Sequence, residues 1–208
     1  MTRRSILQPG QSYTFSKYFE LGIDTEDILA EFGVTLGRSG LVLPLPLDRP
    51  DVELLQQRLR ENLQYVDLTS EAARRECLVF PILMALCQIT QSRLKIEYPI
   101  AVSEQLKGSL DYYVQSAHQF LVVEAKQADL TRGFTQLAVE LIAVDQWTDS
   151  DAPILYGAVT TGDIWKFGSY DRQAKHIEQD LNLYRVPADL PDLMGVLVGT
   201  MGSGETLP

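Results

Sequence analysis

Cysteine and histidine are scarce in this chain of 208 residues, which contains two of each. Cys77 and Cys87 fall within one predicted helix and are nearly three turns apart, which is too far for a disulfide bond. No CxxC pair is present and the histidines are isolated, so neither a zinc site nor a Cys-His nucleophile has a supporting spacing. We therefore expect both cysteines to be buried, reduced thiols.

Long hydrophobic runs are also lacking. No apolar run approaches the roughly 20 residues that a membrane-spanning helix requires, and residues 1–10 contain basic side chains with no hydrophobic signal-peptide core after them. We therefore expect no membrane association and a cytoplasmic location. The composition, 45% apolar and 22% charged, is that of one well-cored globular domain, to which we add an N-terminal extension.

Positive charge is in deficit, because 18 Lys and Arg stand against 28 Asp and Glu, giving a net charge of -10. Such a charge opposes diffuse attraction to a polyanion such as DNA. It does not exclude DNA binding, because a cluster of metal-binding carboxylates contributes to the sum and binding depends on one face of the molecule. One half of the chain carries a group of basic residues: Lys107, Lys126, Arg132, Lys166, Arg172 and Lys175.

Residues 1–66 predict a largely helical extension that packs on the remainder of the chain. Asp24 and the acidic residues after it begin a short amphipathic helix that ends at Gly33. Residues 40–47 form an extended apolar segment whose two prolines exclude a central strand position. Residues 49–62 carry a leucine stripe on a second helix.

Residues 67–208 are predicted to form a compact series of helices and strands joined by short links. Thr69 or Ser70 caps a helix that reaches about Ser92, and Pro81 should kink or split it. The strand with the continuously apolar sequence Phe-Leu-Val-Val is predicted to be central in the sheet. The order of elements predicts an α/β fold with a mixed sheet flanked by helices. The predicted strands are 94–102, 107–115, 120–125, 153–161 and 164–170, and the later helices are 131–147 and 188–201.

Three charged residues on two adjacent predicted strands form the candidate site. Glu124 and Lys126 are two positions apart, so they project from the same face of a strand. If this strand pairs with the preceding one as a hairpin, Asp111 and Glu124 lie at comparable distances from the turn and can approach one metal ion. An apolar strand that ends in Glu-x-Lys has no packing need for either charge.

These residue types suit metal-assisted hydrolysis of a phosphodiester. Two carboxylates hold a hard ion such as Mg²⁺ or Mn²⁺ and leave positions for water and a phosphate oxygen. The ion lowers the pKa of the water and stabilises the developing charge. A neighbouring lysine can orient or deprotonate the water, or offset negative charge.

The pattern as a whole resembles the PD-(D/E)XK nuclease superfamily, which includes restriction endonucleases and Holliday-junction resolvases. Gly108-x-x-Asp111 is followed by an apolar strand into Glu124-x-Lys126 and then by a helix that carries Gln136. The resemblance implies a restriction endonuclease-like core of the order αβββαβ. It also implies a Mg²⁺- or Mn²⁺-dependent endonuclease that acts on DNA, with a homodimer as a frequent assembly in such enzymes.

Two further segments extend the resemblance to about residues 69–170. The helix before the strands offers Glu71 and Glu76, where such nucleases commonly place another acidic ligand. These two lie about 140° apart on a helix, so only one can face the sheet. Residues 156–167 resemble the C-terminal half of the core in type I restriction-subunit-like relatives.

The sequence departs from the family pattern at two positions. Leu110 stands before Asp111 where the superfamily name has proline, which is a common variation. Glu140 follows Gln136 by four residues where the RecB-type pattern has tyrosine, so that subgroup is not indicated.

The resemblance implies Asp111 and Glu124 as metal ligands, with Lys126 beside the attacking water, Gln136 in the site, and Glu71 or Glu76 completing it. Two other functions stay open. The first is a binding or regulatory module that keeps the fold without turnover, which the acidic charge favours. The second is a different metal-dependent hydrolase, because a fold alone does not fix the substrate.

Overall fold

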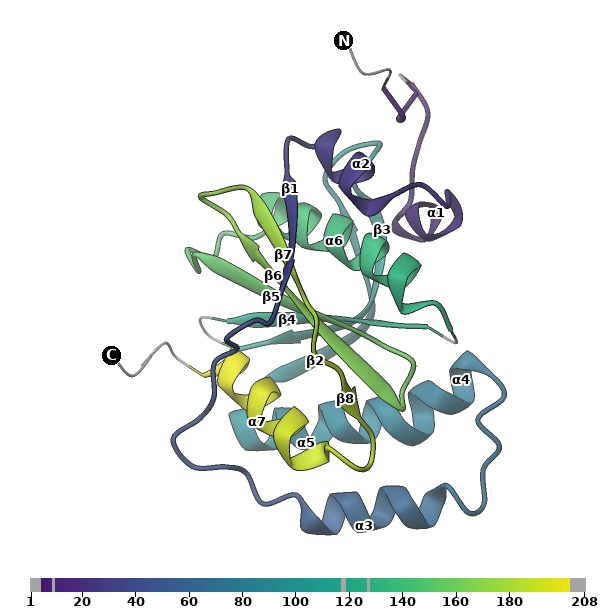
Figure 1. The fold of residues 1–208 in the computed structure, drawn as a ribbon, viewed down its shortest axis with the longest axis vertical. Coiled ribbons are helices and arrows are strands. Elements are labelled where there is room, and N and C mark those ends of the chain that lie inside the picture. The colour runs from purple at the N-terminus through teal and green to yellow at the C-terminus, as the bar shows by residue number, and fades with distance from the viewer. Residues whose placement is uncertain (1–4, 9, 117–118, 127, 203–208) are drawn as a thin grey trace.

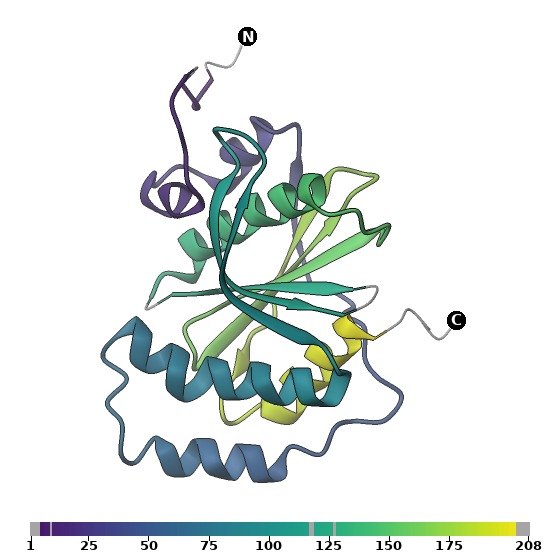
Figure 2. The ribbon, with the colours of Figure 1, turned by 180° about the vertical axis from the view of Figure 1, so that it is seen from behind.

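The computed structural model describes residues 5–8, 10–116, 119–126 and 128–202. Its helices lie on both faces of a twisted sheet, and Figures 1 and 2 show these layers from opposite sides. The helices are α1 (Phe15–Glu20), α2 (Thr25–Ala30), α3 (Glu53–Asn62), α4 (Glu71–Arg74), the π-helical turn η1 (Arg75–Val79), α5 (Phe80–Thr90), α6 (Leu130–Trp147) and α7 (Leu190–Met201).

The sheet is mixed and open, with the strand order β1-β7-β6-β5-β4-β3-β2 and a short β8 paired to β6. β4 runs parallel to β5, β1 runs parallel to β7, and the other neighbouring strands are antiparallel. The bounds are β1 (Thr35–Ser39), β2 (Arg93–Ala101), β3 (Lys107–Gln115), β4 (Phe120–Ala125), β5 (Ile154–Thr160), β6 (Ile164–Asp171), β7 (His176–Asp180) and β8 (Tyr184–Arg185).

The prediction that β4 is a central strand is confirmed, because β4 lies between β3 and β5. Parallel pairing of β4 with β5 requires a crossover connection, and α6 is that connection. α6 lies over one face of the sheet, whereas α5 and α7 cover the other (Figures 1 and 2). α3 packs outside α5 and η1, so it forms an additional outer layer.

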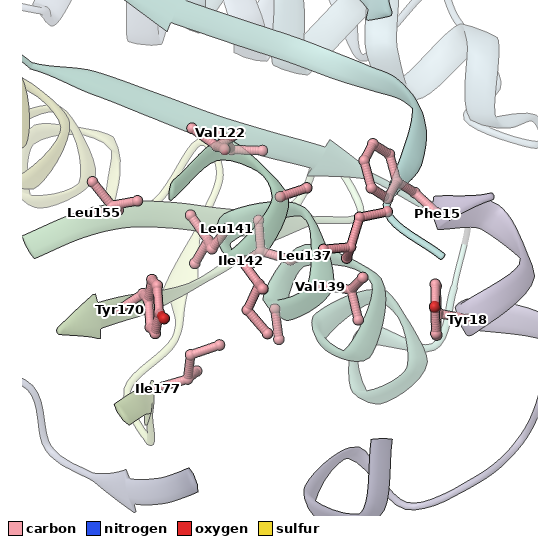
Figure 3. Close-up of a cluster of buried hydrophobic side chains, with 14 of the residues drawn as sticks. Phe15, Tyr18, Val122, Leu137, Val139, Leu141, Ile142, Leu155, Tyr170 and Ile177 are labelled. Carbon is pink, nitrogen blue, oxygen red and sulfur yellow. The ribbon is translucent and has the colours of Figure 1, made fainter. Parts of the chain in front are cut away.

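Side chains of β4 alternate between two hydrophobic clusters. Val122 belongs to the cluster under α6, which Figure 3 shows, while Leu121 and Val123 belong to the cluster under α5 and α7. This alternation follows from the two-residue period of a strand. It also places Glu124 on the α6 face, two positions after Val122.

The helix predicted to begin at Thr69 or Ser70 is present and is interrupted. Ser70 caps it, because its Oγ accepts the N–H of Ala73 at 3.1 Å. The split predicted at Pro81 takes the form of the turn η1, in which the N–H of Phe80 donates to the carbonyl of Arg75. Proline has no N–H to donate to the preceding turn, and a wider π-helical turn just before it absorbs one extra residue.

Residues before the predicted boundary at 66 pack on the core and also enter the sheet. α1 and α2 lie against α6, and β1 forms the edge of the sheet beside β7. The strands β1, β7 and β8 were not predicted, and the predicted helix 49–62 begins later, at Glu53. No helix in the described part of the chain is both long and apolar enough to cross a membrane.

Candidate functional site

The antiparallel ladder between β3 and β4 brings Asp111 close to Glu124. Tyr112 pairs with Val123, and continuing this register by one residue sets Asp111 opposite Glu124. The Asp111 side chain is 19% exposed, and its Oδ2 accepts the N–H of Ala125 at 2.9 Å. One carboxylate oxygen of Asp111 therefore fixes the end of β4, and Oδ1 remains directed to other partners.

Glu124 has no exposed surface and is bound from two directions. Its Oε1 accepts a hydrogen bond of 2.7 Å from Nε2 of Gln136 and forms an ion pair with Nζ of Lys126. The same Nε2 of Gln136 donates to Oε1 of Glu140 at 2.9 Å. Gln136 and Glu140 are one turn apart on α6, so both reach the strand end from above.

The described residues leave three buried oxygens of this group without a hydrogen-bond partner: Oε2 of Glu124, Oε2 of Glu140 and Oε1 of Gln136. A buried acceptor that makes no hydrogen bond loses its water without compensation. Carboxylate and amide oxygens are also the ligands that hard divalent cations prefer. The donor set therefore fits Mg²⁺ or Mn²⁺ chemically.

Burial changes the protonation of the site. Loss of solvent, followed by the carboxylates of Glu140 and Asp111, raises the pKa of Glu124 well above its ordinary value. Burial also raises the pKa of Glu140 to about 8, against the lowering effect of its bond from Gln136. For Lys126, burial opposes the charged form, but the Glu124 carboxylate outweighs it and the pKa of Lys126 is raised. Like charges crowded into an apolar site produce this pattern.

The N-terminal region forms one wall of the site. Phe19 of α1 places its ring 5.1 Å from Nζ of Lys126, which is a cation–π distance. The Lys126 side chain is 15% exposed. A segment predicted only to pack on the core therefore covers the lysine of the candidate site.

Glu71 and Glu76, of which one was predicted to complete the site, are not brought to the carboxylate pair. Both line a cavity of about 480 Å³ beside Phe80 and Ile96. The side chain from this helix that approaches the pair is Arg75, whose Nη1 is 3.9 Å from Oδ1 of Asp111. A regular α-helix would set Glu71 and Glu76 about 140° apart, whereas the π-helical turn that begins at Arg75 changes which residues face the strands.

Glu140 is the member of this cluster that sequence reasoning missed. It was noted only as a departure from a family pattern, although it lies four residues after Gln136 and therefore on the same helix face. A signal was present, because an acidic side chain there interrupts the apolar sequence of a helix that is buried from Gly133 to Val144. The structure brings together Asp111, Glu124, Lys126, Gln136 and Glu140.

In their present arrangement, no group of three or more His, Cys, Asp and Glu residues within the described ranges has the geometry of a metal site. A cation would therefore require the carboxylates to turn toward it. No protein-family model, curated protein or solved structure matches the chain. The chemistry of the residues is accordingly the basis for proposing a function.

Proposed function

We propose that this protein is a Mg²⁺- or Mn²⁺-dependent endonuclease of the PD-(D/E)XK type that hydrolyses DNA phosphodiester bonds. One observation carries the proposal: two buried glutamates, Glu124 and Glu140, face each other beside Asp111 and Lys126, and each keeps one oxygen without a partner. A folded protein has no structural reason to bury two such carboxyl groups together. A cation bound between them supplies one.

The order of elements supports the assignment of a restriction endonuclease-like fold. A helix precedes three antiparallel strands, and α6 then crosses over to the parallel strand β5. This is the αβββαβ order that the resemblance implies for a restriction endonuclease-like core in residues 67–208. Glu124 lies near the end of β4, and Asp111 lies in the middle of β3 where its ladder with β4 ends, which is where such a core places its metal ligands.

The roles of the residues follow from their contacts. Asp111, Glu124 and Glu140 would hold the cation, which when bound lowers the pKa of a water molecule and stabilises negative charge on the phosphate. Nζ of Lys126 donates to the attacking water or to a phosphate oxygen. Nε2 of Gln136 donates to Glu124 and Glu140 and so fixes the spacing of the two carboxylates.

Cleavage assays with matched variants test the proposal. Asp111→Asn, Glu124→Gln and Lys126→Ala should each reduce cleavage by at least about a thousandfold, because each removes a group that acts on the reacting phosphate. Glu61→Gln, an exposed position on α3, should leave the rate unchanged. Circular dichroism should show that all four variants are folded. The proposal fails if the wild-type protein with Mg²⁺ or Mn²⁺ leaves single-stranded, double-stranded and branched DNA intact.

A non-catalytic binding or regulatory module on the same fold is the second candidate, and the net charge of -10 favours it. Calorimetric titration with Mn²⁺ separates the two functions. If the protein is a nuclease, the wild-type protein should bind Mn²⁺ and Glu124→Gln should not. If it is a binding module without a working metal site, the two proteins should give the same heat of titration.

A homodimer is the assembly that we propose for cutting both strands of a duplex, by resemblance to nucleases of this type. Sedimentation equilibrium at micromolar concentrations tests it, with a monomer mass of 23.3 kDa as the reference.

A further inference from the structure

Arg75 is the first residue of the π-helical turn η1, and its guanidinium approaches the Asp111 carboxylate. Nη1 is 3.9 Å from Oδ1 of Asp111, and the side chain is 18% exposed. π-helical turns within α-helices frequently occur at functional sites. This turn places a cation where one of two glutamates was expected.

The guanidinium is held rigidly from two sides. It lies over the Tyr112 ring at 5.0 Å, and its Nε donates to the Tyr112 hydroxyl at 3.3 Å. Nη1 also donates to Oε1 of Glu97 at 3.4 Å. Nη2 makes no hydrogen bond to any residue within the described ranges, so its N–H groups remain available for a ligand.

The order of the contacts separates Arg75 from the lysine of the site. Arg75 approaches Asp111, Asp111 is set opposite Glu124, and Glu124 pairs with Lys126. Arg75 therefore makes its carboxylate contact at Asp111, and Lys126 makes its ion pair at Glu124. If Lys126 acts at the phosphate that is cut, Arg75 is placed for a neighbouring phosphate on the same strand.

The cavity beside Arg75 restricts what binds there. Its volume is about 480 Å³, and it presents Phe80 and Ile96 as an apolar wall. Glu71, Glu76 and Glu97 also line it, and their carboxylates repel phosphate. A nucleic-acid backbone can make a favourable charged contact in this cavity only at Arg75.

We infer that Arg75 binds a DNA backbone phosphate next to the one that is cut. This inference rests on the nuclease function proposed above and adds a substrate-binding residue outside the predicted motif. Arginine suits this role because its planar fork donates two parallel hydrogen bonds to a phosphate.

The first test compares charge variants. Arg75→Gln should reduce kcat/KM for a duplex by about ten- to a hundredfold, the range for losing one hydrogen bond between charged groups. Arg75→Lys should fall between wild type and Arg75→Gln, because lysine keeps the charge without the fork. Arg49→Gln is the matched control, since Arg49 is 66% exposed and pairs with Asp192 on α7. It should change kcat/KM by less than about twofold.

The second test identifies the phosphate. Duplexes that each carry one uncharged methylphosphonate should reveal a position next to the cut where the substitution weakens wild-type cleavage. At that position alone, the methylphosphonate should not reduce cleavage by Arg75→Gln any further, because the contact with the phosphate is already lost. The slope of log Kd against log salt should also fall by about one in Arg75→Gln. The Mn²⁺ affinity should be retained or increase, because Arg75→Gln removes a positive charge beside Asp111. A loss of Mn²⁺ affinity would instead indicate damage to Asp111.

Three outcomes distinguish the claims. A methylphosphonate position that is silent in Arg75→Gln supports the inference. Cleavage by wild type with independent, multiplicative effects of Arg75→Gln and every methylphosphonate overturns the inference and leaves the nuclease function standing. Failure of wild type to bind or cut any DNA overturns both.

Discussion

Asp180, at the end of β7, and Glu124, near the end of β4, are both carboxyl groups with no exposed surface. Oδ1 of Asp180 accepts three hydrogen bonds, from the N–H of Leu41 at 3.1 Å and from the N–H and Nδ2 of Asn182 at 3.0 Å each. Its Oδ2, like Oε2 of Glu124 and of Glu140, has no hydrogen-bond partner among the described residues. Glu124 and its neighbour Glu140 share one donor, Nε2 of Gln136, and Glu124 adds the ion pair with Lys126.

The difference lies in what replaces the lost water. Three fixed N–H donors compensate much of the desolvation of Asp180, and they tie residues 41 and 182 to the sheet edge. The two glutamates instead share the single donor Nε2 of Gln136, and the ion pair with Lys126 reaches Glu124. The three donors to Asp180 make it a stabilising group, whereas the smaller donor set of the Glu124 and Glu140 pair is what the cation site proposed above requires.

Removal of the Asp180 carboxylate should have the largest effect on stability. Asp180→Ala should lower the free energy of unfolding by about 3 kcal/mol, because three N–H groups lose their acceptor at a buried position. Urea denaturation measures the change, with Asp192→Ala on the surface of α7 as the control, which should lose less than about 0.5 kcal/mol. A loss below 1 kcal/mol for Asp180→Ala would contradict the structural role.

Adding and removing the metal ion should distinguish Glu124 from Asp180. Mn²⁺ at about one hundred times its Kd should raise the free energy of unfolding by about 2.7 kcal/mol, and EDTA should reverse the gain. Glu124→Gln should abolish this response, and Asp180→Asn should retain it. An equal response in wild type and Glu124→Gln would show that the ion binds elsewhere.

Most substitutions of buried residues destabilise the fold, whereas neutralising Glu140 should stabilise it. Glu140→Gln should stabilise the metal-free protein by about 1 kcal/mol at pH 8, because it removes a carboxyl group from a site already crowded with carboxylates. The same variant should bind Mn²⁺ more weakly in a calorimetric titration. Destabilisation in EDTA, measured against exposed Glu61→Gln, would place Glu140 with Asp180 as a structural group.

The smallest effect concerns a partly buried carboxylate with a good partner. A hydrogen bond from Arg185 lowers the pKa of Asp189 from 3.8 to about 2. Because the folded-state pKa is the lower one, Asp189 stabilises the fold above about pH 4 and loses this contribution as the pH falls toward 2. Asp189→Asn should therefore lower Tm slightly at pH 7, with a difference from wild type that narrows by pH 3. A constant difference would contradict the assignment.

The hairpin and the crossover helix could be predicted from the sequence because local patterns determine them. Residues 107–115 and 120–125 alternate or stay apolar over strand lengths, and a short link leaves them little choice but to pair. That pairing placed Asp111 near Glu124. Gln136 followed from its position on an amphipathic helix packed over the same strand.

The remaining features depend on contacts between distant parts of the chain. β1 and β7 are five residues each and carry no strong strand pattern, so they form because they pair with each other and with β6. Glu140 lies on the same helix face as Gln136, but only the packing of α6 on the sheet brings this face to Glu124. Arg75 replaces the expected glutamate because a π-helical turn, and not the residue spacing alone, sets which residues face the strands.

The pairing of β1 with β7 has a consequence for the order of assembly. Thr35 lies opposite His176, 141 residues later in the chain, so β1 has no partner strand while the intervening residues are being synthesised. Contacts of such long range are entropically expensive and form late. Until β1 docks, the outer edge of β7 is an open template for another strand. Chaperone dependence and aggregation of nascent chains should therefore be greatest before β1 pairs with β7.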